Sequence, residues 1–139
     1  MRLDITTPFA TVLHTDEAVH VRAEDASGAF GVLRGHADFL TVLSVSVLSW
    51  RDSQASEHYV ALRGGVLSVR NGDSVMVTTT EAVVGEDLRR LEAEVLTRFH
   101  RQADEERAAR TEAQRLQLAA IRQIMRLLRP EQGHAPTVG

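Results

Sequence analysis

Residues 28–50, GAFGVLRGHADFLTVLSVSVLSW, set a glycine-punctuated loop against a run of strand-type residues, with His36 at the join. The run after residue 38 is rich in Val, Leu and Ser and has no helical period, so it predicts a strand. Similar short runs fill residues 3–84 and are broken by turn signals such as Ser27-Gly28 and Gly35. Because no amphipathic helical period occurs before Gly85, we expect antiparallel strands packed face to face as a small β-sandwich.

Two glycine-containing dipeptides refine this expectation. Asn71-Gly72 separates GVLSVR from DSVMVTTT, and both of its residues accept the positive φ of a tight hairpin turn, so a β-hairpin is predicted there. The pair Gly64-Gly65 fits neither a phosphate-binding loop nor a dinucleotide motif, because no helix opens behind it. It is therefore interpreted as a turn or bulge within a strand.

The period changes at Gly85, where an apolar stripe with helical spacing begins. The first stripe consists of Leu88, Leu91, Val95, Phe99 and Ala103, and a second consists of Ala113, Leu116, Ala120, Ile124 and Leu127.

Thr111 and Gln114 between the two stripes have the form of a capping box, which predicts a second helix and hence a two-helix hairpin. No glycine marks the end of a first helix, so one extended helix is the alternative, and a segment able to adopt both forms would suit a conformational switch. Pro130 is expected to end the helical part. The predicted organisation is a sandwich for docking (1–85), a helical regulatory arm (86–130) and a disordered tail (131–139).

Composition limits the possible classes. A chain of 139 residues with 43% apolar content supports one compact domain and an appendage. It contains no cysteine and no lysine, and all 16 basic residues are arginine, for a net charge of −3. Because no stretch approaches the roughly 18 apolar residues of a membrane span and no signal peptide is evident, we expect a cytosolic protein, docked on a membrane-bound one.

The sequence offers little chemistry. None of the six histidines has the spacing of a metal site, so no metal is expected. A small hydrolase using His36 and Asp38 would need a nucleophile, and none has a supporting motif. A further alternative is a β-domain binding module whose Arg-faced helix grips nucleic acid or an acidic protein. Nucleic acid is the weaker choice, because acidic residues are interleaved and aromatic residues are few.

The glycine-rich loop and the order of these segments resemble the epsilon subunit of F-type ATP synthases. That family has a G-acid-hydrophobe-G loop, a leucine and a G-H-A step leading into a strand. The matching residues are Gly28, Ala29, Phe30, Gly31, Leu33, Gly35, His36 and Ala37. The later match at Gly64-Gly65-Val66 and the passage from sheet to helix at residues 81–88 follow in the same order. The opening MRLDITTPF and the helical LTRFHRQADEERAAR are more similar to the alternate N-type group of these ATPases.

The resemblance implies a non-catalytic subunit of the central stalk, in contact with the gamma subunit, the c-subunit ring and the alpha/beta catalytic head. The complex would hold it, without nucleic acid, as a peripheral component on the cytoplasmic side of a bacterial inner membrane. The residues expected to contact gamma and the c ring are Gly28, Ala29, Phe30, Gly31, Arg34, His36 and Asp38. Ala29 stands where the family usually has an acid, so a charge contact at that point is not expected.

The resemblance also implies that the helical arm inhibits ATP hydrolysis in some states. The candidates for contacts with acidic residues of the head are Arg115, Arg122, Arg126 and Arg129. No cofactor is expected, but some members of the family bind ATP as a regulatory ligand at the start of the helices. Asp87 and Arg90 supply the Asp and Arg of that motif, although their neighbours Glu86 and Leu91 depart from it.

Overall fold

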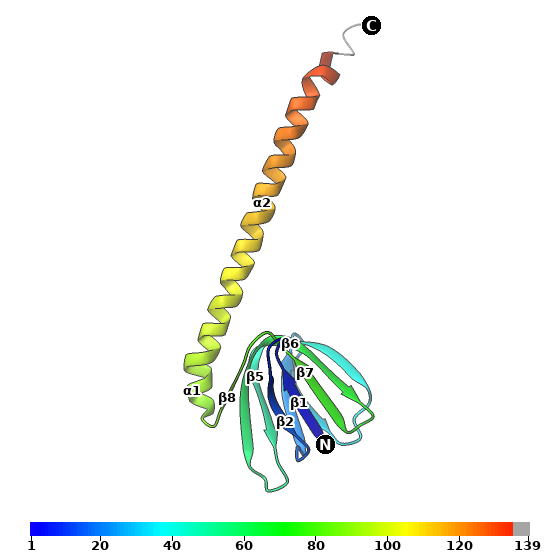
Figure 1. The fold of residues 1–139 in the computed structure, drawn as a ribbon, viewed down its shortest axis with the longest axis vertical. Helices are drawn as coiled ribbons and strands as arrows, with labels where there is room; N and C mark the ends of the chain where they lie inside the picture. Colours follow the sequence, from blue (N-terminus) through cyan, green and yellow to red (C-terminus); the bar gives the residue numbers. More distant parts are fainter. Residues whose placement is uncertain (135–139) are drawn as a thin grey trace. The chain divides into compact units, whose positions relative to one another are not determined.

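The computed structural model describes residues 1–134, including the side chains of residues 1–128. The strands are β1 (Arg2–Thr6), β2 (Thr11–Thr15), β3 (His20–Asp25), β4 (Gly28–Leu33), β5 (Phe39–Arg51), β6 (Glu57–Arg70), β7 (Ser74–Thr78) and β8 (Ala82–Gly85). They follow the order β2-β1-β7-β6-β5-β3-β4, and β8 pairs with β6 (Figure 1). The predicted N-terminal β-sandwich is confirmed. Its pairings are antiparallel except between β1 and β7, which run parallel.

The two long strands β5 and β6 belong to both layers of the sandwich. Their register passes from Leu43 opposite Gly65 to Val45 opposite Arg63, so one residue on each strand is left out of the ladder. Gly64 and Gly65 have φ of +73° and +125°, a backbone conformation that glycine adopts without a Cβ clash. The predicted turn or bulge is not present, because the register is the same on both sides of the glycine pair and β6 continues through it. The positive φ values instead bend β6 from one layer into the other. The Asn71-Gly72 turn is confirmed, with positive φ at both residues.

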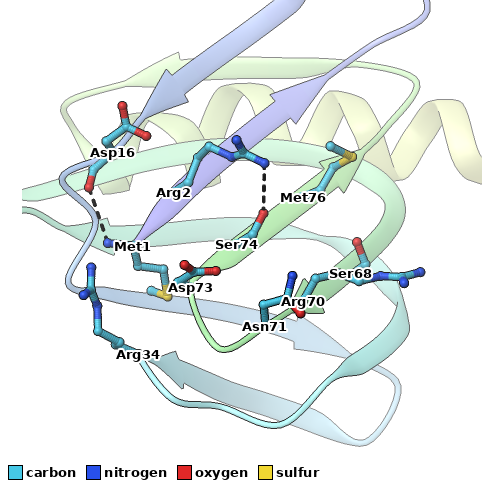
Figure 2. A pocket seen from close by; sticks show the side chains of 10 residues that line it. All are labelled: Met1, Arg2, Asp16, Arg34, Ser68, Arg70, Asn71, Asp73, Ser74 and Met76. Atoms are coloured by element: carbon cyan, nitrogen blue, oxygen red, sulfur yellow. Dashed lines mark hydrogen bonds between the residues drawn. The ribbon is translucent and has the colours of Figure 1, made fainter.

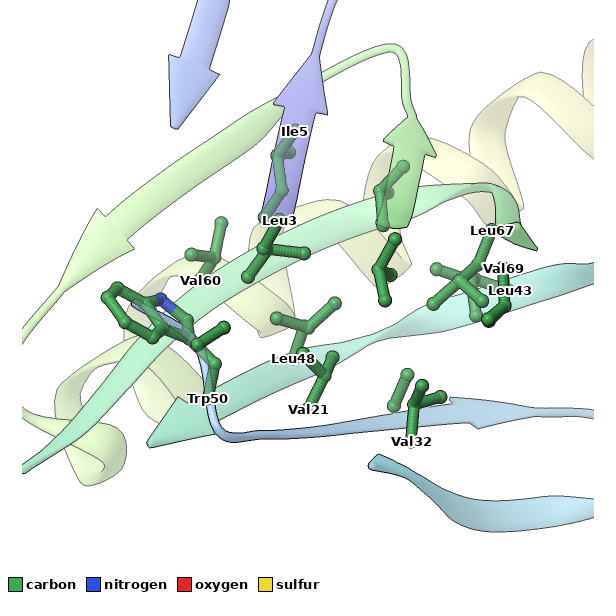
Figure 3. Close-up of a cluster of buried hydrophobic side chains, with 14 of the residues drawn as sticks. Leu3, Ile5, Val21, Val32, Leu43, Leu48, Trp50, Val60, Leu67 and Val69 are labelled. Atoms are coloured by element: carbon green, nitrogen blue, oxygen red, sulfur yellow. The ribbon is translucent and has the colours of Figure 1, made fainter. Parts of the chain in front are cut away.

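The main core lies between the layers and draws on almost every strand (Figure 3). Leu3 and Ile5 of β1, Val21 of β3, and Leu48 of β5 are fully buried there. Each comes from one face of its strand, because successive side chains in a strand point to opposite faces. This alternation is why the sequence shows period two in the short strands.

The helical part begins with α1 (Leu88–Arg90), continues as the π-helical turn η1 (Leu91–Leu96) and becomes α2 (Thr97–His134). Leu91 and Phe99 are buried against Ala61 of β6, with Val95 partly buried beside them. Leu91, Val95 and Phe99 of the first apolar stripe are therefore confirmed as a packing face, whereas Leu88 is exposed. By packing, the chain forms two compact units, Met1–Arg101 and Gln102–Gly139, of which the second is described to His134. The start of the helix thus belongs to the sandwich unit, while the functional division at Gly85 stays a prediction.

The predicted hairpin is not present, and the alternative of one extended helix is confirmed. Thr111 Oγ1 donates a hydrogen bond to the carbonyl oxygen of Arg107 at 3.0 Å, the bond of a helix-interior threonine to the residue four positions earlier. The capping-box prediction was therefore wrong, because the backbone at Thr111 is already helical. The helix also continues four residues beyond Pro130, to His134. A proline removes its own N–H donor and its ring crowds the carbonyl four residues earlier, which costs about 3 kcal/mol but leaves the hydrogen bonds of the neighbouring residues in place. Residues 135–139 of the predicted tail lie outside the described residues.

Thr111→Ala tests the continuity of α2. In a helix interior, alanine is favoured over threonine by up to about 0.7 kcal/mol, so the variant should be slightly more helical than wild type. In a hairpin the same change would remove a cap and cost about 1 kcal/mol. Circular dichroism at 222 nm during thermal melting measures the sign, with Gln114→Ala as the second half of the same box. A loss of helix in both variants would contradict the continuous helix.

Gly65→Ala should lower the free energy of unfolding by more than Gly28→Ala does. Both glycines have strongly positive φ, a strain of about 1–3 kcal/mol for alanine. A Cβ at Gly65 would also lie 2.3 Å from the carbonyl oxygen of Thr78, whereas one at Gly28 meets no atom within 4 Å. Urea unfolding of the two variants measures the difference, and equal losses would contradict the tight bend.

Candidate docking surface

The predicted contact loop begins in β4, which lies at one end of the strand order. Ala29 and Gly31 are exposed, whereas Phe30 is half-buried against the core. Gly28 has φ of +118° in the tight turn that joins β3 to β4. The loop therefore presents backbone and small side chains to solvent, while Phe30 fixes it to the sandwich.

Asp25 holds this turn in place. Its Oδ1 accepts hydrogen bonds from Ser27 N at 2.9 Å and from Ser27 Oγ at 2.5 Å, and its Oδ2 accepts one from Thr41 Oγ1 at 2.6 Å. These bonds, first of all that from the Ser27 hydroxyl, lower the pKa of Asp25 below its usual value, because they stabilise the carboxylate. Sequence reasoning missed this residue, although Asp followed two positions later by Ser is a turn signal.

The second half of the predicted loop, residues 34–38, is tied to the β6–β7 turn. Gly35 N donates to the carbonyl oxygen of Gly72 at 2.7 Å, and Asn71 N donates to Asp38 Oδ1 at 2.9 Å. His36 Nδ1 lies 2.7 Å from its neighbour's carbonyl oxygen at Ala37. Both turns are thus locked to each other, which gives the loop a defined shape.

Phe39 joins the two halves of the loop and was missed in the sequence. Its ring packs edge-on against Phe30 at a centroid distance of 5.6 Å and against His36 at 5.7 Å. An aromatic residue at the start of a strand gives no signal by itself. The structure brings Phe30 and His36 to the same ring, so residues 28–31 and 34–38 form one surface.

An apolar patch lies beside this loop, on the outer face of the layer that contains β7 and residues 66–70 of β6, called the first layer below. This patch was not predicted from the sequence. Leu40 and Val42 of β5 are 70% and 71% exposed, and Val66 of β6 and Met76 of β7 are 41% and 44% exposed. The register places Val42 opposite Val66, and Ser68 opposite both Leu40 and Met76. These four apolar residues, called the sheet patch below, are therefore contiguous. The sequence signal for the patch is that β5 has apolar residues on both of its faces, a pattern typical of strands that are covered on both sides.

A hollow of about 650 Å³ adjoins the sheet patch (Figure 2). Arg2, Arg34 and Arg70 line it, together with Ser68 and Met76 of the patch rows. One of the arginines is held, since Arg2 donates to Ser74 Oγ at 3.4 Å and lies 3.3 Å from an oxygen of Asp4. The hollow and the sheet patch thus share a border.

The hydrolase alternative gains nothing from the geometry. His36 and Asp38 hydrogen-bond to different backbone groups, at Ala37 and Asn71, so neither orients the other. Within residues 1–128, whose side chains are described, no three His, Asp or Glu side chains are arranged to hold a metal ion. Over the same residues, no helix has the length and apolarity needed to span a membrane.

The two residues assigned to ATP binding are engaged locally. Asp87 Oδ1 accepts hydrogen bonds from Arg89 N and Arg90 N and so caps α1, and Arg90 Nε donates to Glu94 Oε2 at 3.2 Å. Both residues line a hollow of about 450 Å³, but Glu86 and Glu94 line it too. Carboxylates there oppose a nucleotide's phosphates. ATP as a regulatory ligand stays a prediction from the resemblance.

The arginines assigned to inhibitory contacts lie in the second half of α2. Arg115, Arg122 and Arg126 are exposed, and Arg115 forms a 3.7 Å ion pair with Glu112, while the side chain of Arg129 lies outside the described side chains. The same part of the helix carries exposed apolar side chains of Leu116, Leu118, Ile121, Ile124, Met125, Leu127 and Leu128. Cationic and apolar groups are thus both free to meet a partner.

Comparison with known proteins agrees with this architecture. Residues 1–85 match a family model described as the ATP synthase delta/epsilon chain beta-sandwich domain. The chain is 44% identical over 135 residues to ATP synthase epsilon chain 2 of Paraburkholderia xenovorans, covering 97% of both chains. It is 46% identical over 128 residues to ATP synthase epsilon chain 2 of Cereibacter sphaeroides, covering 92% of this chain and 88% of that one.

Two solved structures share the fold. A chain of the Euglena gracilis mitochondrial ATP synthase (OSCP/F1/c-ring) superposes with a TM-score of 0.58 at 23% identity, covering 76% of this chain and 62% of that one. A chain of the Tetrahymena thermophila mitochondrial ATP synthase (central stalk/c-ring) gives 0.52 at 16% identity, covering 68% and 71%.

Asp25→Asn should change how stability depends on pH. Because the folded-state pKa of Asp25 lies below its unfolded value, the carboxylate contributes stability above the unfolded pKa and loses it as pH falls through the folded one. The difference in unfolding free energy between wild type and Asp25→Asn should therefore shrink on acidification from pH 6 to pH 3, values spanning about the usual Asp range. Urea unfolding at each pH measures it, with Glu24→Gln as the control. A difference that stays constant over this range would contradict the role of the ionised group.

Proposed function

The chain belongs to the ATP synthase delta/epsilon family, and from this membership we propose that it is the epsilon subunit of the central stalk of a rotary F-type ATP synthase. Its sandwich docks the subunit to the stalk and the c ring. Its helical arm regulates ATP hydrolysis. The relatives that span nearly the whole chain carry the name ATP synthase epsilon chain, which supports this assignment.

The sheet patch carries the proposal for docking. Val42 and Leu40 keep about 70% of their surface in water, although the core beneath them is complete. Burial of apolar surface stabilises an association by roughly 25 cal/mol per Å², so a protein that leaves such a patch open gains from a partner that covers it. In the proposed function the gamma subunit covers the sheet patch.

The loop at residues 28–38 extends this surface toward the c ring. Gly28, Ala29 and Gly31 bring backbone close to a partner, while His36 supplies a polar group beside them. Asp38 is committed to the β6–β7 turn, so its role is to hold the loop rather than to meet the c ring directly. With Ala29 in place of an acid, we propose that contact with the c ring depends on shape and backbone hydrogen bonds at this point.

The helical arm is the proposed regulatory element. An isolated helix with a long exposed apolar side gains stability chiefly from packing, so the arm's state depends on which surface it meets. Arg115, Arg122, Arg126 and Arg129 are proposed to meet acidic residues of the alpha/beta head when the arm inhibits hydrolysis. A partner shifts such an equilibrium only through unequal affinity for its two states.

The proposed subunit performs no catalysis itself and is a peripheral part of the membrane-bound complex, on the cytoplasmic side of a bacterial inner membrane. The alternative of a nucleic-acid-binding module has no support from the family or from the relatives. Over residues 102–128, the arm that suggested it exposes seven large apolar side chains and five arginines, which suits a protein partner better than a phosphate backbone.

Docking and regulation should separate in two variants. Val42→Asp should weaken binding to the epsilon-depleted complex by more than about 30-fold, since a charge at the centre of an apolar interface costs at least 2 kcal/mol. Deletion of residues 102–139 should leave binding intact and raise ATP hydrolysis. This deletion keeps Leu91 and Phe99, which are buried against the sandwich. Binding is measured by co-sedimentation with the depleted complex, and hydrolysis by phosphate release.

The matched control for the docking variant is Val84→Asp. Val84 is a 53% exposed valine on β8. This strand pairs with residues 59–62 of β6, which belong to the layer that does not carry the sheet patch. Equal loss of binding in Val84→Asp and Val42→Asp would sink the role of the sheet patch. Wild type that fails to bind the depleted complex at all would overturn the proposed function.

A further inference from the structure

Arginines are concentrated at the hollow beside the sheet patch. Residues 1–85 contain six arginines and ten acidic residues, so the sandwich as a whole is acidic. Three of the six arginines, Arg2, Arg34 and Arg70, line this one hollow, against only two of the ten acids, Asp16 and Asp73 (Figure 2). The hollow is thus a cationic spot on an acidic domain.

Two of these arginines have no side-chain partner among the described residues. Neither the Arg34 nor the Arg70 side chain makes an ion pair or a hydrogen bond with another residue in the described part of the chain, and both are exposed. Arg2, in contrast, is engaged with Asp4 and Ser74. An unpaired guanidinium presents five N–H donors that suit planar carboxylates. Arg34 and Arg70 are therefore free to bind an external anion.

The backbone that carries these two arginines is fixed. Arg34 precedes Gly35, whose N–H donates to the carbonyl oxygen of Gly72, and Arg70 precedes Asn71, whose N–H donates to Asp38. A Cβ at Gly72 would lie 3.0 Å from the Gly35 Cα, so the two turns are in close contact. Because the backbone is anchored, a bound anion has to order only the arginine side chains, which lowers the entropic cost of binding.

The hollow continues the sheet patch without a break. Met76 belongs to both, and Ser68, which lines the hollow, lies opposite Leu40 and Met76 in the sheet. An apolar centre with charged residues at its edge is the usual arrangement of a protein interface. A partner that covers the sheet patch therefore also covers the border of the hollow.

We propose that this hollow binds carboxylate side chains of the stalk subunit that covers the sheet patch, with Arg34 and Arg70 as the binding residues. The inference rests on the proposed function and adds the chemistry of the partner: an acidic segment next to the apolar contact. Protein carboxylates fit better than a free phosphate for two reasons. The arginines come from three separate segments around a wide hollow, and Asp16 and Asp73 inside it would repel a dianion about twice as strongly as a singly charged carboxylate.

The first test is the salt dependence of binding. Arg34→Gln together with Arg70→Gln should weaken binding to the epsilon-depleted complex by about tenfold at low salt, and the deficit should shrink as salt screens the charges. Arg51→Gln is the matched control, because the Arg51 side chain is 42% exposed and lies outside both the hollow and the loop at residues 28–38. Circular dichroism of each variant verifies that it is folded.

The outcomes separate this inference from the proposed function. If the double variant binds like wild type at every salt concentration while Val42→Asp does not bind, the inference fails and the docking function stands. If wild type does not bind the depleted complex, both fail. If the full-length chain binds phosphatidylglycerol vesicles and the double variant does not, a lipid headgroup rather than a protein carboxylate occupies the hollow, which also overturns the inference.

The second test uses the absence of lysine from the chain. Arg34→Lys keeps the positive charge and introduces a single side-chain amine, which a carbodiimide couples only to a carboxylate in direct contact. The assembled complex should then yield a cross-link between position 34 and an Asp or Glu of another subunit, identified by mass spectrometry. Arg51→Lys, the matched control, should yield no cross-link to another subunit. Cross-links confined to Asp16 or Asp73 of the same chain would contradict the proposal.

Discussion

The antiparallel ladder between β5 and β6, folded over at Gly64 and Gly65, is the constraint on which the rest of the sandwich depends. Each half of the ladder is the seed of one layer, because β7 continues from residues 66–70 and β8 from residues 59–62 of the same strand. The bend requires positive φ at both residues, which glycine adopts readily. It also requires that residue 65 has no side chain, because a Cβ there would clash with the backbone of Thr78. A straight β6 would extend one sheet and leave both of its faces open.

This folded ladder creates two inner faces and two outer ones. The inner faces bury Leu43, Leu48, Val60 and Leu67 in the core. The outer face of the second layer is covered by the start of the helix, where Phe99 is fully buried. The outer face of the first layer keeps the sheet patch in water. The docking surface thus follows from the same topology as the core, because the helix that leaves β8 reaches one outer face and not the other.

Most of the sandwich could be predicted from the sequence, because its turns and strands depend on short local patterns of residues. The Asn71-Gly72 turn and the Gly64-Gly65 bend need residues that tolerate positive φ, and few residue types do. The single helix could not be distinguished from a hairpin in the same way. Thr111 and Gln114 match the sequence pattern of a capping box. A cap also requires a non-helical backbone at Thr111, however, and the sequence pattern alone does not determine that conformation. The cap motif alone therefore does not decide that choice.

The candidate surface was predictable only in part for a related reason. The loop at residues 28–38 was found through its glycines, whereas Phe39, Asp25 and the sheet patch depend on register. Leu40 and Val42 look like core residues in sequence, and whether they face the core or the solvent is set by which residue of β6 stands opposite them. An apolar run in a bent strand therefore predicts that the residues are buried, but not whether the chain's own core or a partner protein buries them.

The packing of the helix explains how docking and regulation can coexist in one chain. Leu91 and Phe99 give the first helical residues the stability of the sandwich, so partner binding at the sheet patch does not need the arm. Beyond Arg101 the apolar residues of α2, such as Leu127, find no cover within their own compact unit. Their burial energy is available to whichever surface they meet. The proposed equilibrium of the arm is consequently set by its partners, while its anchor is set by the chain itself, and this separation is what the proposed regulatory role requires.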